Sequence, residues 1–407
     1  MIRFKLSKLG PGLLFAGAAI GVSHLVQSTR AGADFGWGLL WALVLTNLFK
    51  YPFFQAGPRY AIATGESLLE GYFKIGKGYL WVYFLLNFIT MFTIQTAVTV
   101  VTAGLASQLF GFTDNIVVWS IALTFFCTLL LFIGRYQLLD GFIKIIMAIM
   151  ALCSVAAFAF ASFKTDAALS WTQIFPKGSE LLFLVAFMGW MPAPLDISIW
   201  HSIWTLEKNK SKKKKIGLKE SLFDFNVGYL GTFILAFCFL GLGALVMYQS
   251  GSSFSSNGTV FAGQLIGLYT TNFGQHLYWI IALAAFTTML STSITTLDAS
   301  PRSMAQTYGL LFPKKKGLPY AFWLMFLASG TAIIFLFLLS EMYLLVQIAT
   351  VLSFITSPLY AFLNYKLIFG SFLPKKAQPS GLNKRLAQLG LIFLFSFTLY
   401  YLLGLPT

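Results

Sequence analysis

Charged residues, histidine and cysteine are all scarce in this chain of 407 residues. Only 10% of the residues are charged, and there are three histidines and three cysteines. Each cysteine lies inside an apolar run without a second cysteine at CxxC spacing, which argues against a disulfide framework and a zinc cluster. No nucleophile–base pair or phosphate-cradling loop can be assembled from the other polar residues. The sequence therefore predicts neither an enzyme nor a bound cofactor.

Apolar residues are correspondingly abundant. Hydrophobic residues make up 57% of the chain and 43 residues are Phe, which is too apolar for a soluble domain of this length. The formal net charge is +15, but Lys and Arg lie in short connections between apolar runs instead of forming one basic face. This pattern predicts a polytopic membrane protein that contacts the lipid bilayer and binds no nucleic acid.

Eleven apolar runs are long enough to cross the roughly 30 Å hydrocarbon core of a bilayer as helices. We therefore predict an all-α fold. The runs lie at residues 10–34, 37–63, 79–109, 115–134, 139–163, 179–205, 220–248, 274–298, 318–340, 342–370 and 386–404. The first run superficially resembles a signal peptide, but it continues into the next span and is interpreted as uncleaved.

Basic residues collect on one side of these predicted helices. The strongest cluster, at residues 208–219, follows the sixth span, and further clusters follow the second, eighth and tenth spans. By the positive-inside rule, the N-terminus is cytoplasmic. Because the number of spans is odd, the C-terminus lies outside. We expect a multi-pass protein of a bacterial-type inner membrane or a plasma membrane.

Two spans are interrupted at corresponding places, the first at residues 18–24 and the sixth at residues 188–194. A bilayer-spanning helix tolerates such breaks only where the freed backbone groups face protein or water. Paired breaks in an inverted repeat mark the substrate site of many secondary transporters. We predict a single transporter domain at residues 1–407. It consists of a first five-helix repeat at 10–163, a second, inverted five-helix repeat at 179–370, and an additional helix at 386–404.

Several short motifs are shared with a known group of transporters. The stretches GPGLL at residues 10–14 and AGADFGWGLLW at 31–41 match GPG and AGAQFGY at the same spacing, and TSIT at 292–295 resembles SSTIT. By these motifs the chain resembles the natural resistance-associated macrophage protein (NRAMP) family of divalent metal transporters. The resemblance implies a LeuT-type fold, a five-plus-five inverted repeat with helices one and six broken.

The family's metal-binding residues are replaced in this chain. Where the family reads DPGN, residues 21–24 read GVSH, so the resemblance implies that glycine replaces the metal-binding carboxylate and histidine the metal-binding amide. Where the family reads MPHN, residues 191–194 read MPAP, which keeps the thioether and loses the histidine. Gln95 and Val98 stand at two acidic positions associated with proton movement, and the arginine pair of the ninth helix has no counterpart. The usual proton route is therefore expected to be absent.

The candidate substrate site lies between the two breaks. Its expected members are Ala18, Gly21, His24, Met188, Met191 and Asp196. Of these, His24, Met191 and Asp196 are the candidate metal ligands, since an imidazole and a thioether suit transition metals. A carboxylate in a membrane span is a functional candidate by default.

Each candidate ligand also has a structural interpretation. His24 fits a hydrogen-bonded structural histidine, Met191 fits ordinary packing, and Asp196 fits a cap on the second half-helix after the prolines. Further polar residues in the spans line a pathway or serve structure: Gln27, Arg30, Asp34, Gln95 and Gln347. Arg30 and Asp34 stand at i,i+4 spacing and are expected to pair.

The leading hypothesis is an NRAMP-related transporter that moves a divalent cation by alternating access without the usual proton route. A unit charge pair at 4 Å contributes about 4 kcal/mol at an effective dielectric constant near 20, so loss of one carboxylate costs a dication roughly twice that. Either Asp196 replaces the missing charge, or the ion, such as Mg²⁺ or Mn²⁺, stays largely hydrated, or the substrate is not a dication. The alternative is a LeuT-fold carrier of a small organic solute, such as an amino acid or amine.

Overall fold

The protein is entirely helical in the part of the chain that the computed structural model describes. The structure describes residues 10–134, 136–164, 170–211, 215–248, 258–274, 278–314, 317–337 and 342–404, with single positions between them. The basic residues near the N-terminus, which contributed to the predicted orientation, lie outside the described residues. All-α architecture is thus confirmed for the described chain.

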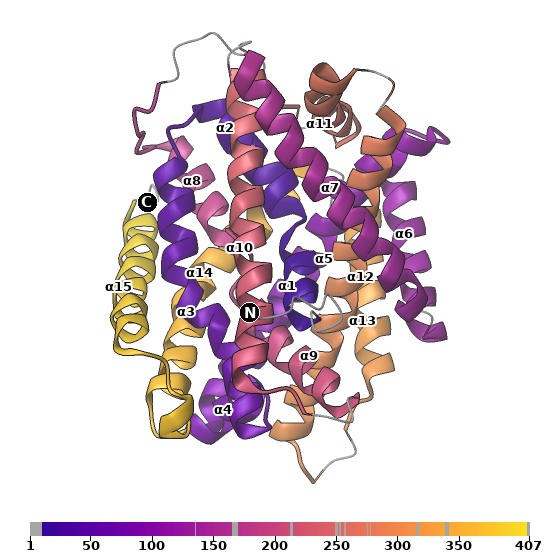
Figure 1. The fold of residues 1–407 in the computed structure, drawn as a ribbon. Helices are drawn as coiled ribbons and strands as arrows, with labels where there is room; N and C mark the ends of the chain where they lie inside the picture. The colour runs from indigo at the N-terminus through magenta and orange to yellow at the C-terminus, as the bar shows by residue number, and fades with distance from the viewer. Residues whose placement is uncertain are drawn as a thin grey trace.

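The helices follow one another with short connections (Figure 1). Their bounds are α1 Pro11–Ala19, η2 Ser23–Ser28, α2 Thr29–Phe35, α3 Leu40–Thr64, α4 Leu68–Ile75, α5 Lys77–Phe110, α6 Ile116–Ile133, α7 Tyr136–Lys164, α8 Ser179–Trp190, α9 Ile197–Ser211, α10 Leu218–Leu242, η3 Gly243–Met247, α11 Gly258–Phe273, α12 Tyr278–Leu311, α13 Tyr320–Phe337, α14 Met342–Phe369, η6 Lys375–Ala377 and α15 Gly381–Leu403. The first predicted span coincides with α1, η2 and α2, and each of the other ten predicted spans coincides with one or two of these helices.

Seven of the described helices are long and apolar enough by themselves to cross a membrane, or eight when the bent pair at residues 11–35 counts as one span. The eighth predicted span ended at residue 298, whereas α12 continues to Leu311 through Pro301. This proline does not end the helix, because the polar last turns of α12 still pack on neighbouring helices. Ser303 and Thr307 each donate their hydroxyl to the carbonyl four residues earlier.

Helices α5 and α12 pack along each other in the interior, and both are largely buried. By contrast, only 28% of the apolar stretch of α6, α13 or α15 is buried. The last of these lies at the outer edge of the molecule beside α3 (Figure 1). The broken helices α1 and α8 are enclosed by this scaffold, so the backbone groups that they free at membrane depth face protein.

The first half-helix is tied to α10 at its N-terminus. The backbone N–H groups of Gly10 and Gly12 donate to the two carboxylate oxygens of Asp224, each at 3.0 Å. A helix N-terminus leaves such donors without partners and favours a negative charge. The close approach requires glycine, since a Cβ atom at Gly228 would lie 2.2 Å from the carbonyl oxygen of Gly12. This contact fixes where α1 begins.

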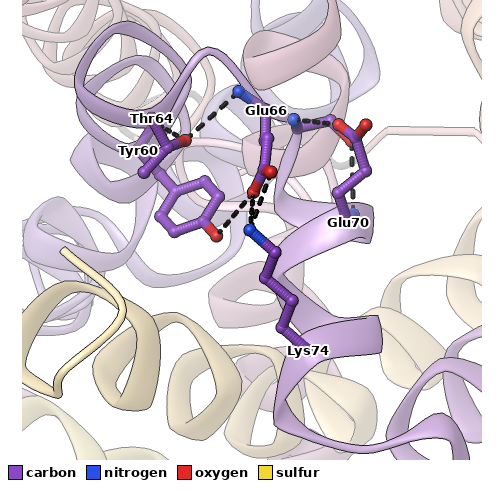
Figure 2. A network of polar contacts seen from close by, with 6 residues as sticks. Tyr60, Thr64, Glu66, Glu70 and Lys74 are labelled. Atoms are coloured by element: carbon purple, nitrogen blue, oxygen red, sulfur yellow. Dashed lines mark hydrogen bonds and ion pairs between the residues drawn. The ribbon is translucent and has the colours of Figure 1, made fainter.

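The turn between α3 and α4 carries a network of polar side chains (Figure 2). Ser67 and Glu70 form a capping box, in which each side chain accepts from the other's backbone N–H. Lys74 donates to both carboxylate oxygens of Glu66, and the hydroxyl of Tyr60 donates to Glu66 at 3.4 Å. The side chain of Lys74 is half exposed, so this lysine lies at the protein surface.

Candidate functional site

The first break separates α1 from the π-helical segment η2, and the helix axis bends by 46° across it. Two carbonyl oxygens freed by the break, those of Gly17 and Ile20, lie 3.2 and 3.4 Å from the hydroxyl of Thr292 on α12. The same hydroxyl lies 3.2 Å from the carbonyl oxygen of Thr288 on its own helix, and its one proton is donated to one of these three oxygens at a time. Thr292 therefore supplies one hydrogen-bond donor for the freed carbonyl groups of the broken helix.

Thr292 also fills the space beside Gly21. A Cβ atom at Gly21 would lie 2.8 Å from Oγ1 and 2.9 Å from Cγ2 of Thr292, which is closer than such atoms approach one another. Glycine is therefore required at this position by packing. The resemblance places a metal-binding carboxylate here, and in this chain the corresponding space is occupied by a threonine side chain.

The second break exposes carbonyl groups at the C-terminal end of α8. The ammonium group of Lys50 on α3 donates to the carbonyl oxygens of Met188 at 2.8 Å and Gly189 at 2.7 Å, and lies 3.5 Å from that of Ala193. Lys50 is fully buried. An ammonium ion in a membrane interior is costly unless it is paired or bound by carbonyl oxygens, so this contact is what permits the lysine there.

Lys50 was not among the residues expected from the sequence. It stands within the apolar run 37–63 and has no acidic residue three or four positions away with which to pair. Its partners are about 140 residues distant in the chain. The signal that would have found it is the presence of one lysine in the middle of a span, which marks an intramembrane ionisable residue.

Asp196 stands in the turn before α9 and is buried. Its carboxylate faces the backbone N–H groups of Asp196 and Ile197 and interacts electrostatically with Lys50. Its Oδ1 atom has no hydrogen-bond partner among the described residues. This placement favours the capping interpretation.

His24 is buried and both of its ring nitrogens are engaged. Nε2 lies 2.9 Å from the carbonyl oxygen of Thr232, and Nδ1 lies 2.7 Å from the hydroxyl of Ser23 and 3.0 Å from the carbonyl oxygen of Ala19. Because a carbonyl oxygen only accepts, Nε2 carries a proton. The contacts favour the structural interpretation, in which the ring ties the first break to α10.

Met191 is buried, and its sulfur atom accepts from the hydroxyl of Ser28 at 3.6 Å. This contact joins the two broken helices directly, since Ser28 ends the segment η2. Neighbouring Gln27 is buried with its Oε1 atom unpartnered among the described residues. Arg30 and Asp34 form the expected i,i+4 ion pair at 3.1 Å, and both side chains are partly exposed.

Gln95 links α5 to α12. Its amide nitrogen donates to Thr99 at 3.1 Å, and its amide oxygen accepts from the hydroxyl of Thr296 at 2.7 Å. A carboxamide held in this way has no group that takes up a proton near neutral pH. Gln347 lies half-buried on α14.

A cavity of about 20 Å³ lies between the two breaks. Its walls include Ala18 and Ser23 from the first break, Trp190 and Pro194 from the second, and Thr292 and Thr296 from α12. One water needs about 10–15 Å³ on this measure, so the cavity admits one water or one small ion. His24, Met191 and Asp196 do not line it, and no group of three His, Cys, Asp or Glu side chains in the described chain is placed to hold a metal ion.

Comparison with known proteins places the chain among transporters. The model of the natural resistance-associated macrophage protein-like family matches residues 12–403. An uncharacterized protein of Pasteurella multocida is 36% identical over 98% of this chain and 92% of its own length. The divalent metal cation transporter MntH of Yersinia enterocolitica is 35% identical over 68 residues, which is 17% of either chain.

Solved structures share the fold. A mutant of the manganese transporter of Eremococcus coleocola superposes with a TM-score of 0.73 at 15% identity, over 96% of this chain and 85% of that one. Mhp1, a nucleobase-cation-symport-1 family transporter with bromovinylhydantoin bound, superposes with a TM-score of 0.63 at 15% identity, over 98% of this chain and 91% of that one. The predicted LeuT-type fold with broken helices one and six is confirmed.

Proposed function

The chain belongs to the natural resistance-associated macrophage protein-like family, and from that membership we propose that it is a secondary transporter of a divalent metal cation such as Mn²⁺ or Mg²⁺. The observation that carries the proposal is the match of the family model to nearly the whole chain. MntH, which shares a short stretch with this chain, is a divalent metal cation transporter. The transported ion would pass between the two broken helices by alternating access.

The size and lining of the central cavity support a small ion as substrate. A volume of about 20 Å³ leaves no room for an organic molecule in this conformation. The lining offers hydroxyl groups from Ser23, Thr292 and Thr296 and no carboxylate. Without a carboxylate, a dication loses on the order of 8 kcal/mol of direct attraction, so we propose that it keeps much of its water, as Mg²⁺ readily does.

We further propose that transport proceeds without the family's usual proton route. Gln95 stands at one of its acidic positions, and the amide is held between Thr99 and Thr296. Val98 stands at the other. Metal flux is therefore expected to be insensitive to an imposed pH gradient at constant membrane potential. The proposed orientation, with the N-terminus in the cytoplasm, follows from the distribution of Lys and Arg.

The test is metal uptake into proteoliposomes. Ala18→Leu adds three carbon atoms to a side chain that lines the cavity, and is expected to abolish uptake of Mn²⁺ and Mg²⁺. Ala148→Leu makes the same change at an exposed position on α7 and is the matched control, with uptake expected at the wild-type level. Absence of flux for every divalent metal in the wild-type protein would contradict the proposal, as would full activity of the Ala18→Leu variant.

A carrier of a small organic solute remains the second candidate, and Lys50 is the observation that favours it. A buried ammonium group beside the second break attracts a substrate carboxylate and repels a dication. Such a solute needs a conformation with a larger cavity. Thermal-shift measurements with amino acids, amines and divalent metals separate the two candidates, because a ligand that binds only the folded state raises the melting temperature.

A further inference from the structure

We propose that the carbonyl oxygens at the second break form a cation site and that the ammonium group of Lys50 is its built-in occupant. The site consists of the carbonyl oxygens of Met188, Gly189 and Ala193. The inference rests on the proposed function only in placing the transport site between the two breaks. It adds that one cation-binding position of that site is filled by a charge attached to the chain itself.

The geometry of the contact is that of a bound cation. Two carbonyl oxygens at 2.7 and 2.8 Å and a third at 3.5 Å converge on one Nζ atom. Two of them belong to the last turn of α8, where the helix dipole places partial negative charge. In transporters with broken helices, carbonyl groups at such half-helix ends coordinate cations. An ammonium group with three donors satisfies the same oxygens as a small ion would.

Within the described part of the chain, these carbonyl oxygens are the hydrogen-bond partners of Lys50. It is fully buried and stands on α3, which is an unbroken helix that packs against α9. Asp196, in the turn before α9, interacts electrostatically with Lys50. A soluble cation can reach these carbonyl oxygens only after the ammonium group has moved away. Lys50 thus competes with every soluble cation for this position.

The inference distinguishes a cation substitute from a simple structural tie between α3 and α8. If the charge and the N–H donors matter, a small ammonium ion from solution will replace the side chain when the side chain is shortened. If Lys50 only fills space, ammonium ions will have no effect. The probes are therefore methylammonium and tetramethylammonium. Both carry one positive charge, but only methylammonium has N–H donors.

The experiment uses the full-length protein in detergent and follows its melting temperature as each salt is added. In Lys50→Ala, methylammonium chloride is expected to raise the melting temperature saturably by roughly 2–4 °C. Tetramethylammonium chloride at the same ionic strength is expected to have no effect. Lys74→Ala, which removes a surface lysine paired with Glu66 (Figure 2), is the control and should not respond to methylammonium.

Lys50→Gln serves as a second variant, since its amide donates to the carbonyl oxygens without a charge and keeps the packing of α3. We expect this variant to bind Mn²⁺ at least tenfold more tightly than the wild-type protein, because the repelling charge is gone. A folded variant that gains neither methylammonium nor Mn²⁺ binding overturns the inference. Saturable stabilisation of the wild-type protein by methylammonium also overturns it, since the site would then be vacant. Absence of divalent metal flux in the wild-type protein, together with the expected methylammonium and Mn²⁺ binding by the two variants, would contradict the proposed function alone.

Discussion

Restoring a carboxylate at the first break tests whether the missing charge sets the metal affinity. The perturbation is Gly21→Asp combined with Thr292→Ala. The second change is needed because a Cβ atom at Gly21 would lie 2.8 and 2.9 Å from the terminal atoms of Thr292. Removing those atoms also frees the carbonyl oxygens of Gly17 and Ile20, which now face the threonine hydroxyl. The double variant thus gains an anionic ligand and two neutral ones.

The added charge determines the expected gain in Mn²⁺ affinity, and the crowding at Thr292 determines the expected loss of stability. A carboxylate at about 4 Å from a dication contributes roughly 8 kcal/mol at an effective dielectric constant near 20. Dehydration of both ions offsets most of this, and if about a third remains, Mn²⁺ binds about 100-fold more tightly. Gly21→Asp alone crowds Thr292 and is expected to destabilise the protein by about 1–3 kcal/mol. The second substitution should recover most of that loss.

The assay is equilibrium Mn²⁺ binding to purified protein, by calorimetry or with radioactive metal. Gly21→Asn with Thr292→Ala is the matched control, because asparagine has the size of aspartate without its charge. If the aspartate variant binds Mn²⁺ no more tightly than the asparagine variant, charge at this position does not limit affinity. The hydrated-ion explanation for the glycine would then be refuted.

Two further predictions concern contacts that hold the first half-helix. Asp224→Ala removes the acceptor for the N–H groups of Gly10 and Gly12 and should cost about 1–3 kcal/mol of stability, measured as a lower melting temperature; an unchanged value would show that water replaces the carboxylate. His24→Ala leaves the carbonyl oxygen of Thr232 without its donor and should cost about 2–4 kcal/mol while Mn²⁺ affinity stays constant. A loss of Mn²⁺ affinity without loss of stability would instead assign His24 to the metal.

Local sequence patterns predicted those features that depend on neighbouring residues. Glycine and proline within apolar runs indicated both breaks, because these residues weaken a helix wherever they stand. The i,i+4 spacing of Arg30 and Asp34 predicted their ion pair for the same reason, since residues four apart share a helix face. The bounds of α12 were less accurate, because the apolar run ended at residue 298 whereas the helix continues through Pro301 to Leu311.

Local sequence patterns could not predict contacts between helices that are distant in the sequence. Gly21 was interpreted as the replacement of a metal-binding carboxylate, and nothing in the sequence indicated that Thr292 from α12 fills the space beside it. Lys50 was overlooked because one lysine hardly changes the mean hydropathy of a long apolar span. Its partners are carbonyl groups, which every residue carries, so no residue type in the sequence marks them. Backbone ligands therefore become visible only when the fold brings the chain together.

The two breaks are satisfied in the same manner, and this has a consequence for how a substrate gains access. At each break, carbonyl oxygens that lack intrahelical donors face one donor side chain on an unbroken helix. At the first break this is the hydroxyl of Thr292 on α12, which donates to one oxygen at a time, and at the second it is the ammonium group of Lys50 on α3. A movement of α1 and α8 relative to α3 and α12 would separate both pairs at once. The freed oxygens would then need a new partner, because an unsatisfied carbonyl group in a membrane interior costs several kcal/mol. An entering ion with its remaining water supplies that partner, so exposure of the site and substrate binding would be coupled by the same hydrogen bonds.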